Sequence, residues 1–386
     1  MFRCAPSRIV LLAMLWLGCA LPLMAQEATL PRVILRTAES LRLPGGRQPE
    51  AGIEDAIDSN CPVAWNDAGQ MLVFTSVTHP FRSSGANLFS LVAPSIETTI
   101  ERLPELVGGV WLEATYRDAN GVLFGWYHNE QYAGCEDTHL TVPRIGSMLS
   151  YDDGLTWYDL GMVLTAPADS LTCESHNYFF AGGNGDFSVV LDEAGEYFYF
   201  IFGAYHQQIE EQGICLARMR FEDRFAPVGK VWKWYADGWE QGGLEGRVTP
   251  IIGVANDWHS EMPDAYWGPS VHYNTHLQQY VMLLNRAVDP YWSQEGVYIS
   301  YNLDLANPQG WSTPQLLDID PQGRAYPEFI GLLPNETDKR LGKFGRLFLL
   351  GESNGEIEFM RPEEKSLTIP PRRKTDGTRD LPTRNP

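Results

Sequence analysis

YFYFIFG, at residues 197–203, is one of five very apolar, aromatic stretches that decide the fold. The others are MLVFTSV (71–77), VLFGWYH (122–128), YVMLLNR (280–286) and RLFLLGE (346–352). A turn containing Asp, Asn or Gly links each stretch to a preceding partner: CPVAWND, VWLEATYRD, GDFSVVLD, WGPSVHYN and YPEFIGLLP. Units that recur at irregular intervals of roughly fifty to eighty residues are typical of radial blades. The sequence therefore predicts an all-β, five-bladed β-propeller with four-stranded antiparallel blades.

The last blade has only three obvious strands before Met360, so its fourth strand must come from elsewhere. PRVILRT (31–37) has strand character and would supply the missing outer edge, which closes the ring. We expect a single propeller over residues 26–360. A tail over residues 361–386, rich in Pro and charge, is expected to be disordered. The predicted blades span about residues 60–103, 110–163, 183–234, 266–317 and 326–360.

The first residues resemble a secretory signal. Arg3 and Arg8 precede an apolar run from Ile9 to Met24, and the small residue Ala25 follows it. We expect residues 1–25 to be a signal peptide and the mature protein to be secreted or periplasmic. A lipoprotein acylated at Cys19 is the weaker alternative. No later stretch approaches the ~20 apolar residues of a membrane span.

The net charge limits the classes of binding partner, and the cysteines predict one disulfide. The 386-residue chain carries a formal net charge of -20, which argues against nucleic acid and anionic membranes and favours neutral substrates. We expect a monomer. Cys135 and Cys173 lie in polar loop sequence on either side of one hairpin and are the expected disulfide, whereas Cys215 resembles an ordinary strand residue. The chain has no CxxC or Cys/His cluster, so a structural zinc site is not expected.

The first strand of each blade lines the central channel, so polar residues near its start converge on one mouth. Every blade offers a carboxylate there, within strands that are otherwise apolar. Buried carboxylates around one axis cost free energy unless they are paired, hydrogen-bonded or used. Hydrolysis of a glycosidic bond needs two carboxyl groups in different protonation states. In blade order the polar residues are Asp58 with Asn60, Glu113, Asn184 with Asp186, Asp264, and Glu328.

This layout resembles the five-bladed glycoside hydrolases of the arabinanase and β-xylosidase type, family 43 and its relatives. The phrases GGNGDFSVVLD (182–192), EQGICLAR (211–218) and YWGPSVHYNTHLQQYVMLLNRA (266–287) are similar to secreted propellers of the DUF4185 kind. The resemblance spans about residues 58–314 and implies a secreted glycosidase acting on a polysaccharide or oligosaccharide, arabinan among them.

The same resemblance implies catalytic roles. Asp58 corresponds to the base and Asp186 to the carboxylate that sets the pKa of the acid. In the family the acid usually follows that residue, where this chain offers Asp264 or Glu328. We rank Glu113 first, because the aromatic inner strand WLEATYRD could raise its pKa.

Further residues of the same mouth are candidates for sugar binding. Arg82 lies in HPFRSSG, and His128 precedes Glu130 in GWYHNE. Solvated loop positions explain Arg82 and His128 equally well. Trp267 offers a stacking surface, although a wedge between blades is the commoner role of a propeller tryptophan. The remaining candidates are Asn184, Asp264, His272 and Glu328.

SYDDGLTW (150–157) matches the Asp-box of sialidases and many other propellers. Its predicted role is structural: Asp152 accepts hydrogen bonds from the turn, Gly154 takes a left-handed φ, and Trp157 packs between strands. A sialidase-like enzyme is one alternative. It would need three arginines that bind a carboxylate, and the only arginines in plausible positions are Arg82, Arg144 and Arg286. The other alternative is a non-catalytic carbohydrate-binding propeller.

No cofactor is required. An axial calcium ion would be compatible with the carboxylates at the mouth of the channel.

Overall fold

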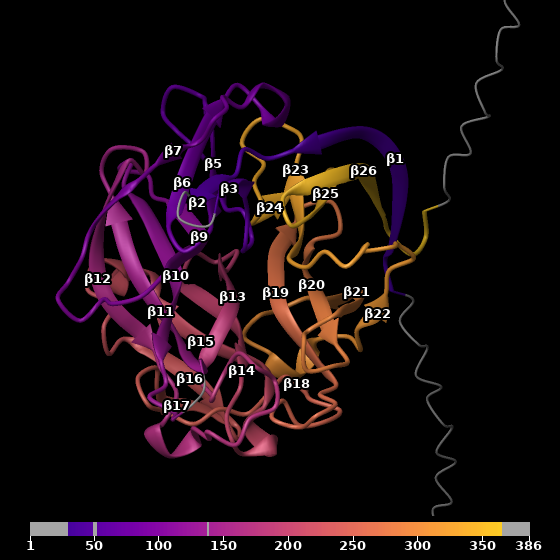
Figure 1. Cartoon of the computed structure of the whole chain (residues 1–386). Coiled ribbons are helices and arrows are strands. Elements are labelled where there is room, and N and C mark those ends of the chain that lie inside the picture. Colours follow the sequence, from indigo (N-terminus) through magenta and orange to yellow (C-terminus); the bar gives the residue numbers. More distant parts are fainter. Residues whose placement is uncertain (1–29, 49–51, 137–138, 365–386) are drawn as a thin grey trace, which may run out of the picture.

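The structure is a computed structural model that describes residues 30–48, 52–136 and 139–364. Five sheets are arranged in a ring around a central axis, which confirms the five-bladed β-propeller (Figure 1). Successive blades follow one another in chain order, and the inner strands of all five face the axis. A small hairpin, β2 (Gly46–Gln48) with β3 (Ile53–Ala56), precedes the first blade.

The strands of each blade have the following bounds. Blade one holds β4 (Val63–Trp65), β5 (Met71–Ser76), β6 (Pro80–Gly85) and β7 (Ile96–Glu97). Blade two holds β9 (Val110–Arg117), β10 (Leu123–Tyr132), β11 (Thr141–Ser150), β12 (Thr156–Leu164) and β8 (Thr99–Glu101). Blade three holds β13 (Asn184–Leu191), β14 (Tyr197–Ala204), β15 (Gly213–Arg220), β16 (Val231–Tyr235), β17 (Gly238–Gly242) and β18 (Ile252–Gly253). Blade four holds β19 (Ala265–Asn274), β20 (Gln279–Ala287), β21 (Gln294–Asn302), β22 (Gln315–Leu316) and β24 (Arg340–Leu341). Blade five holds β23 (Pro327–Gly331), β25 (Phe344–Leu349), β26 (Glu352–Met360) and β1 (Arg32–Arg42).

The second strand of each blade is apolar on both faces because neighbouring blades cover both of them. Strand β14, the YFYFIFG stretch, is buried over seven of its eight residues. Its Phe198 packs against Trp126 of blade two with ring centroids 4.9 Å apart. On the opposite face, Tyr199 and Ile201 join a cluster with Val271 of blade four. The core is therefore a series of apolar layers between blades rather than one central core.

The ring is closed by the N-terminal strand, as predicted. Strand β1 pairs antiparallel with β26, in a register that runs from Arg32 opposite Met360 to Arg42 opposite Glu352. The prediction of four strands in every blade is wrong, since the sheets hold four to six. The additional strands are short connecting segments. Strands β8 and β24 pair in parallel with β12 and β19 and so join adjacent blades.

Two local predictions also have structural counterparts. Cys135 and Cys173 form a disulfide, as expected, and Cys215 is a buried residue of β15. In the turn at residues 150–157, the amide of Thr156 donates to Asp152 Oδ1 (2.8 Å) and Gly154 has φ +79°. Trp157 is fully buried, and its ring centroid lies 5.6 Å from that of Phe74 in blade one. The turn therefore anchors blade two to blade one.

The sequence predicts a signal peptide at the N-terminus and a disordered tail at the C-terminus. The predicted signal peptide lies outside the described residues. The predicted tail begins inside them: Arg361 donates to the carbonyl of His276, and Glu364 lies 3.3 Å from Lys343 Nζ. Residues 365–386 again lie outside. In the part of the chain that is described, no helix has the length and apolar character to cross a membrane.

Candidate active site

A recess of about 290 Å³ lies at the mouth where the inner strands begin. Its walls are aromatic, and its polar side chains are carboxylates and one imidazole. None of the described residues that line it is Lys or Arg, so the recess favours neutral or cationic groups over anions. The lining residues are Asp58, Trp111, Glu113, His128, Glu130, Phe179, Phe180, Asp186, Trp267, Trp292, Gly323, Ala325, Tyr326 and Leu350.

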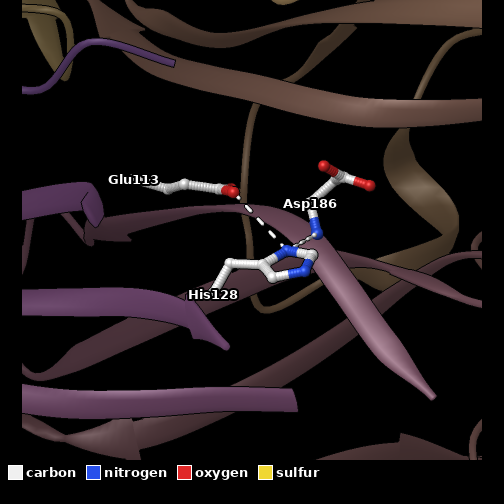
Figure 2. A group of neighbouring side chains, drawn as sticks. All are labelled: Glu113, His128 and Asp186. Atoms are coloured by element: carbon white, nitrogen blue, oxygen red, sulfur yellow. Dashed lines mark hydrogen bonds and ion pairs between the residues drawn. The ribbon is translucent and has the colours of Figure 1, made fainter. Parts of the chain in front are cut away.

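Three buried side chains from adjacent blades meet at the base of the recess (Figure 2). Glu113 from β9, His128 from β10 and Asp186 from β13 each place one polar atom within 4.8 Å of the others. The amide of Asp186 donates to His128 Nδ1 (3.1 Å), and Glu113 Oε1 lies 3.6 Å from the same nitrogen. The amide of Phe187 donates to Glu113 Oε2 (2.7 Å). Blades two and three are thus joined through the site itself.

Asp186 is held in an unusual conformation. Its φ is +43°, a left-handed value that non-glycine residues adopt at a cost. The surroundings impose it: Tyr205 donates its hydroxyl to Oδ2 (2.8 Å), and Tyr326, itself at φ +53°, donates to Oδ1 (3.3 Å). Burial raises the pKa of Asp186, whereas the two hydroxyl donors lower it by favouring the ionised form, which only accepts. Strain that the fold maintains at one position is characteristic of functional sites.

The carboxyl groups of the recess differ in proton affinity. Burial raises the pKa of Glu113 to about 8, and the negative charge of Asp186 adds to this rise. Asp58 has an exposed side chain, although the recess walls surround it. Partial enclosure, with the charges of Asp186 and Glu130, raises the pKa of Asp58 to about 6. Of these two lining residues, Glu113 therefore keeps its proton to higher pH than Asp58 does.

His128 lies between opposing influences. Burial lowers its pKa, but the surrounding carboxylates outweigh burial and raise the pKa to about 9. The hydrogen bond from the Asp186 amide, however, requires a lone pair on Nδ1. We assign the neutral form with its proton on Nε2, because the backbone fixes the direction of that N–H. Nε2 then faces Glu130 Oε1 at 3.3 Å. With a neutral imidazole, the more distant charge of Lys339 is the cation that still lowers the pKa of Glu113.

The segment GGNG before Asp186 explains how β13 comes so close to β10. A methyl group at Gly185 would lie 2.6 Å from Cε1 of His128 and 2.7 Å from Cβ of Pro143. We expect Gly185→Ala to lower the free energy of unfolding by about 1–3 kcal/mol through overpacking. Urea denaturation measures this. Gly253→Ala is the control, since a methyl group there meets nothing within 4 Å; equal losses in the two variants would contradict the contact with His128.

Glu113, His128 and Asp186 are also the described residues that could hold a metal ion. Their donor atoms are already engaged within the protein. Nδ1 of His128 accepts the Asp186 amide, and both oxygens of Asp186 accept tyrosine hydroxyls. Calcium prefers six to eight oxygen ligands, so this donor set does not fit it, and the axial calcium ion stays a prediction.

The structure places five predicted binding residues outside the recess. Asp264 forms a bidentate ion pair with Arg286 (2.8 and 2.9 Å). Glu328 is buried and does not line the recess; both of its carboxyl oxygens accept the Cys61 amide at 3.1 Å. The other three are Arg82, which donates to the carbonyl of Asp153, Asn184, which bonds to His206, and His272, which packs between Phe329 and Phe359.

Trp267 lies at the edge of the recess, and its role as a stacking surface for sugars stays a prediction. It lines the recess, yet its side chain is buried and its ring packs against those of Trp292 (5.0 Å) and Tyr326 (5.5 Å). The arginines that a sialidase would require are not gathered: Arg286 pairs with Asp264 and Arg144 donates to Asn129.

Sequence reasoning missed several residues of the recess. Glu130 was named beside His128 without a role, although it lines the mouth and accepts from Thr141 (3.1 Å). The hydroxyl donor Tyr205, which bonds to Asp186, directly follows strand β14 and lies two residues beyond the predicted strand, a position that could have identified it. Phe179, Phe180 and Trp292 come from loops, whose paths no periodic pattern predicts.

No protein-family model matches this chain, and no curated protein matches it. The resemblance to DUF4185 propellers therefore stays a prediction. Similar solved structures include an exo-β-1,3-galactanase from Phanerochaete chrysosporium with β-1,3-galactotriose (10% identity, TM-score 0.46, 85% of this chain and 63% of that one). Others are an endo-arabinase from Bacteroides thetaiotaomicron (10%, 0.49, 80% and 96%) and a thermostable family 43 glycoside hydrolase (13%, 0.46, 83% and 91%).

This chain thus spans less than two thirds of the galactanase structure, at 63% of its length. At these identities the likeness concerns the fold alone, which the sheets of this chain establish independently.

Proposed function

We propose that this protein is a glycoside hydrolase that acts on neutral sugars of a polysaccharide or oligosaccharide. The observation that carries the proposal is that one aromatic-walled recess gathers the carboxyl groups of Asp58 and Glu113, and that burial raises the pKa of Glu113 further than that of Asp58. Glycosidic cleavage requires this combination. The resemblance of the sequence to arabinan-degrading propellers supports the same reaction class.

Glu113 is the proposed general acid. Its proton would pass to the glycosidic oxygen as the bond from that oxygen to the anomeric carbon breaks. Asp58 is the proposed base: it would take a proton from the water whose oxygen attacks the anomeric carbon, or would attack that carbon itself. Asp186, fixed by Tyr205 and Tyr326, would keep a negative charge beside Glu113 and so maintain its raised pKa.

The aromatic walls suit a sugar ring, since aromatic faces stack against its C–H groups while hydroxyls reach the carboxylates. Trp267, Trp292 and Tyr326 form such a wall. A volume of about 290 Å³ is at the lower limit of small-molecule sites. One terminal sugar residue would therefore fill the recess, which favours cleavage from a chain end.

The charge of the recess predicts its selectivity. We expect turnover of at least one neutral fluorogenic glycoside of arabinose, xylose or galactose, and kcat/KM at least about a hundredfold lower for a uronide or a sialoside, because none of the described lining residues is a Lys or Arg that would balance their carboxylate. Rates measured on this panel and on arabinan, xylan and galactan check the prediction. Preferred turnover of a sialoside would contradict it, and the absence of any hydrolysis would favour a non-catalytic sugar-binding propeller.

A further inference from the structure

Two tyrosines stack on each other while remaining largely open to solvent. Tyr178 is 60% exposed and Tyr291 is 69% exposed, yet their ring centroids lie 5.2 Å apart with an interplanar angle of 23°. Tyr178 belongs to the connection between β12 and β13, and Tyr291 to the loop between β20 and β21. The pair therefore joins the loops of two different blades.

The pair, which we call the rim tyrosines, lies next to the recess. Each member directly adjoins a lining residue in the sequence: Phe179 follows Tyr178, and Trp292 follows Tyr291. The rings of Phe179 and Trp292 contact each other edge to face at 5.5 Å. The aromatic wall of the recess thus continues outward onto the rim.

Hydrogen-bonded turns hold both rim tyrosines at the surface, and the first of these turns contains Tyr178. Tyr178 has φ +63°, and the buried Asn177 fixes its turn by accepting the amides of Phe179 and Phe180 at 2.9 Å each. The same asparagine donates to the carbonyl of Trp258 (3.2 Å). A left-handed backbone that leaves most of an aromatic side chain in water costs stability and gains little burial, which points to a use outside folding.

The second loop is built in a similar way. Asp289 Oδ1 accepts the amides of Tyr291 (2.9 Å) and Ser293 (3.1 Å), and Trp292 has φ +60°. Trp292, which follows Tyr291 in the sequence, stacks on Trp258 with ring centroids 4.5 Å apart. The disulfide at Cys173 restrains the first loop. Both rings are therefore pre-positioned, which reduces the entropy lost when a ligand binds them.

We propose that the rim tyrosines form a carbohydrate subsite for the sugar residues that precede the terminal one in a neutral chain. This inference rests on the proposed function and deepens it, naming chains rather than small glycosides as substrates. The recess holds about one residue, so the next must lie at its rim, where the tyrosine rings offer faces for stacking. The net charge of -20 is compatible with a neutral chain.

The test compares long and short substrates. The hydrolysis panel identifies the preferred sugar. For the Tyr178→Ala/Tyr291→Ala variant, kcat/KM on the trisaccharide of that sugar should fall about tenfold more than on its aryl monoglycoside, which equals the loss of ~1.4 kcal/mol of binding. Tyr151→Ala/Tyr158→Ala is the control. Those tyrosines are also a solvent-exposed pair, 66% and 44% exposed with centroids 6.1 Å apart, in the 150–157 turn and on β12. Equal losses on both substrates would overturn the subsite.

A binding measurement separates this inference from the proposed function. If the wild-type protein hydrolyses nothing, its binding of arabinotriose, xylotriose and galactotriose is measured by calorimetry. Binding that is about tenfold weaker in the rim variant, Tyr178→Ala/Tyr291→Ala, and unchanged in the control variant would support the subsite and reject the hydrolase. Absence of binding would reject both. A concentration-dependent dimer that disappears in the rim variant would show that a second copy, not a sugar, covers the tyrosines.

Discussion

Asp58→Asn is expected to lower kcat by about 10²–10⁴-fold on the best neutral substrate, the range over which a positioned acid or base acts. The amide cannot accept the proton of water or attack the anomeric carbon, while its size and shape match those of the carboxylate. Asp58 is the carboxylate most open to substrate, because its side chain is exposed inside the recess. Steady-state kinetics measure the effect, and circular dichroism confirms that the variant folds.

The matched control for this substitution is Asp67→Asn. Asp67 lies near the opposite mouth of the ring, with an 84% exposed side chain that faces Arg117 at 3.4 Å. Its replacement should leave kcat within about twofold, as most surface substitutions far from a site do. If the two variants lost activity equally, or if Asp58→Asn retained wild-type kcat, the role of Asp58 would be refuted.

The second large effect concerns pH. We expect kcat/KM to follow a bell-shaped profile, falling below about pH 6 as Asp58 takes up a proton and above about pH 8 as Glu113 loses one. Activity falls on both sides because the base must be ionised and the acid must be protonated.

Glu113→Gln should lower kcat by about 10²–10⁴-fold on substrates with poor leaving groups and should remove the alkaline limb.

Glu328→Gln provides a stringent control for the alkaline limb. Burial also raises the pKa of Glu328 to about 8, but its carboxyl group accepts the Cys61 amide and does not line the recess. This variant should keep both limbs of the profile, because the group does not reach the substrate. Loss of the alkaline limb in Glu328→Gln, with its retention in Glu113→Gln, would exchange the assignments of the two glutamates.

The fold could be predicted from the sequence because each blade carries its own signal. An apolar second strand such as YFYFIFG is needed only where neighbouring blades cover both faces, so five such strands indicate five blades. The closing role of β1 followed from one missing strand. The additional strands β8 and β24 could not be predicted, since segments of two or three residues pair only where the ring brings them beside a neighbour.

The site could be predicted only where one rule sufficed. Side chains near the starts of inner strands converge on the axis, which placed Asp58, Glu113 and Asp186 in the recess. Asp264 precedes β19 and turns to Arg286, and Glu328 in β23 meets a buried amide instead. One position along a strand reverses the direction of a side chain. The aromatic wall depends on loop paths, which the disulfide and the left-handed residues at 178 and 292 set.

The most direct test of the central claim is a crystal structure of the Asp58→Asn variant soaked with arabino-, xylo- and galacto-oligosaccharides. The account predicts a terminal sugar in the recess, with its glycosidic oxygen within hydrogen-bond distance of Glu113 and its anomeric carbon facing residue 58. An oligosaccharide bound at another surface while the recess contains only water would contradict it.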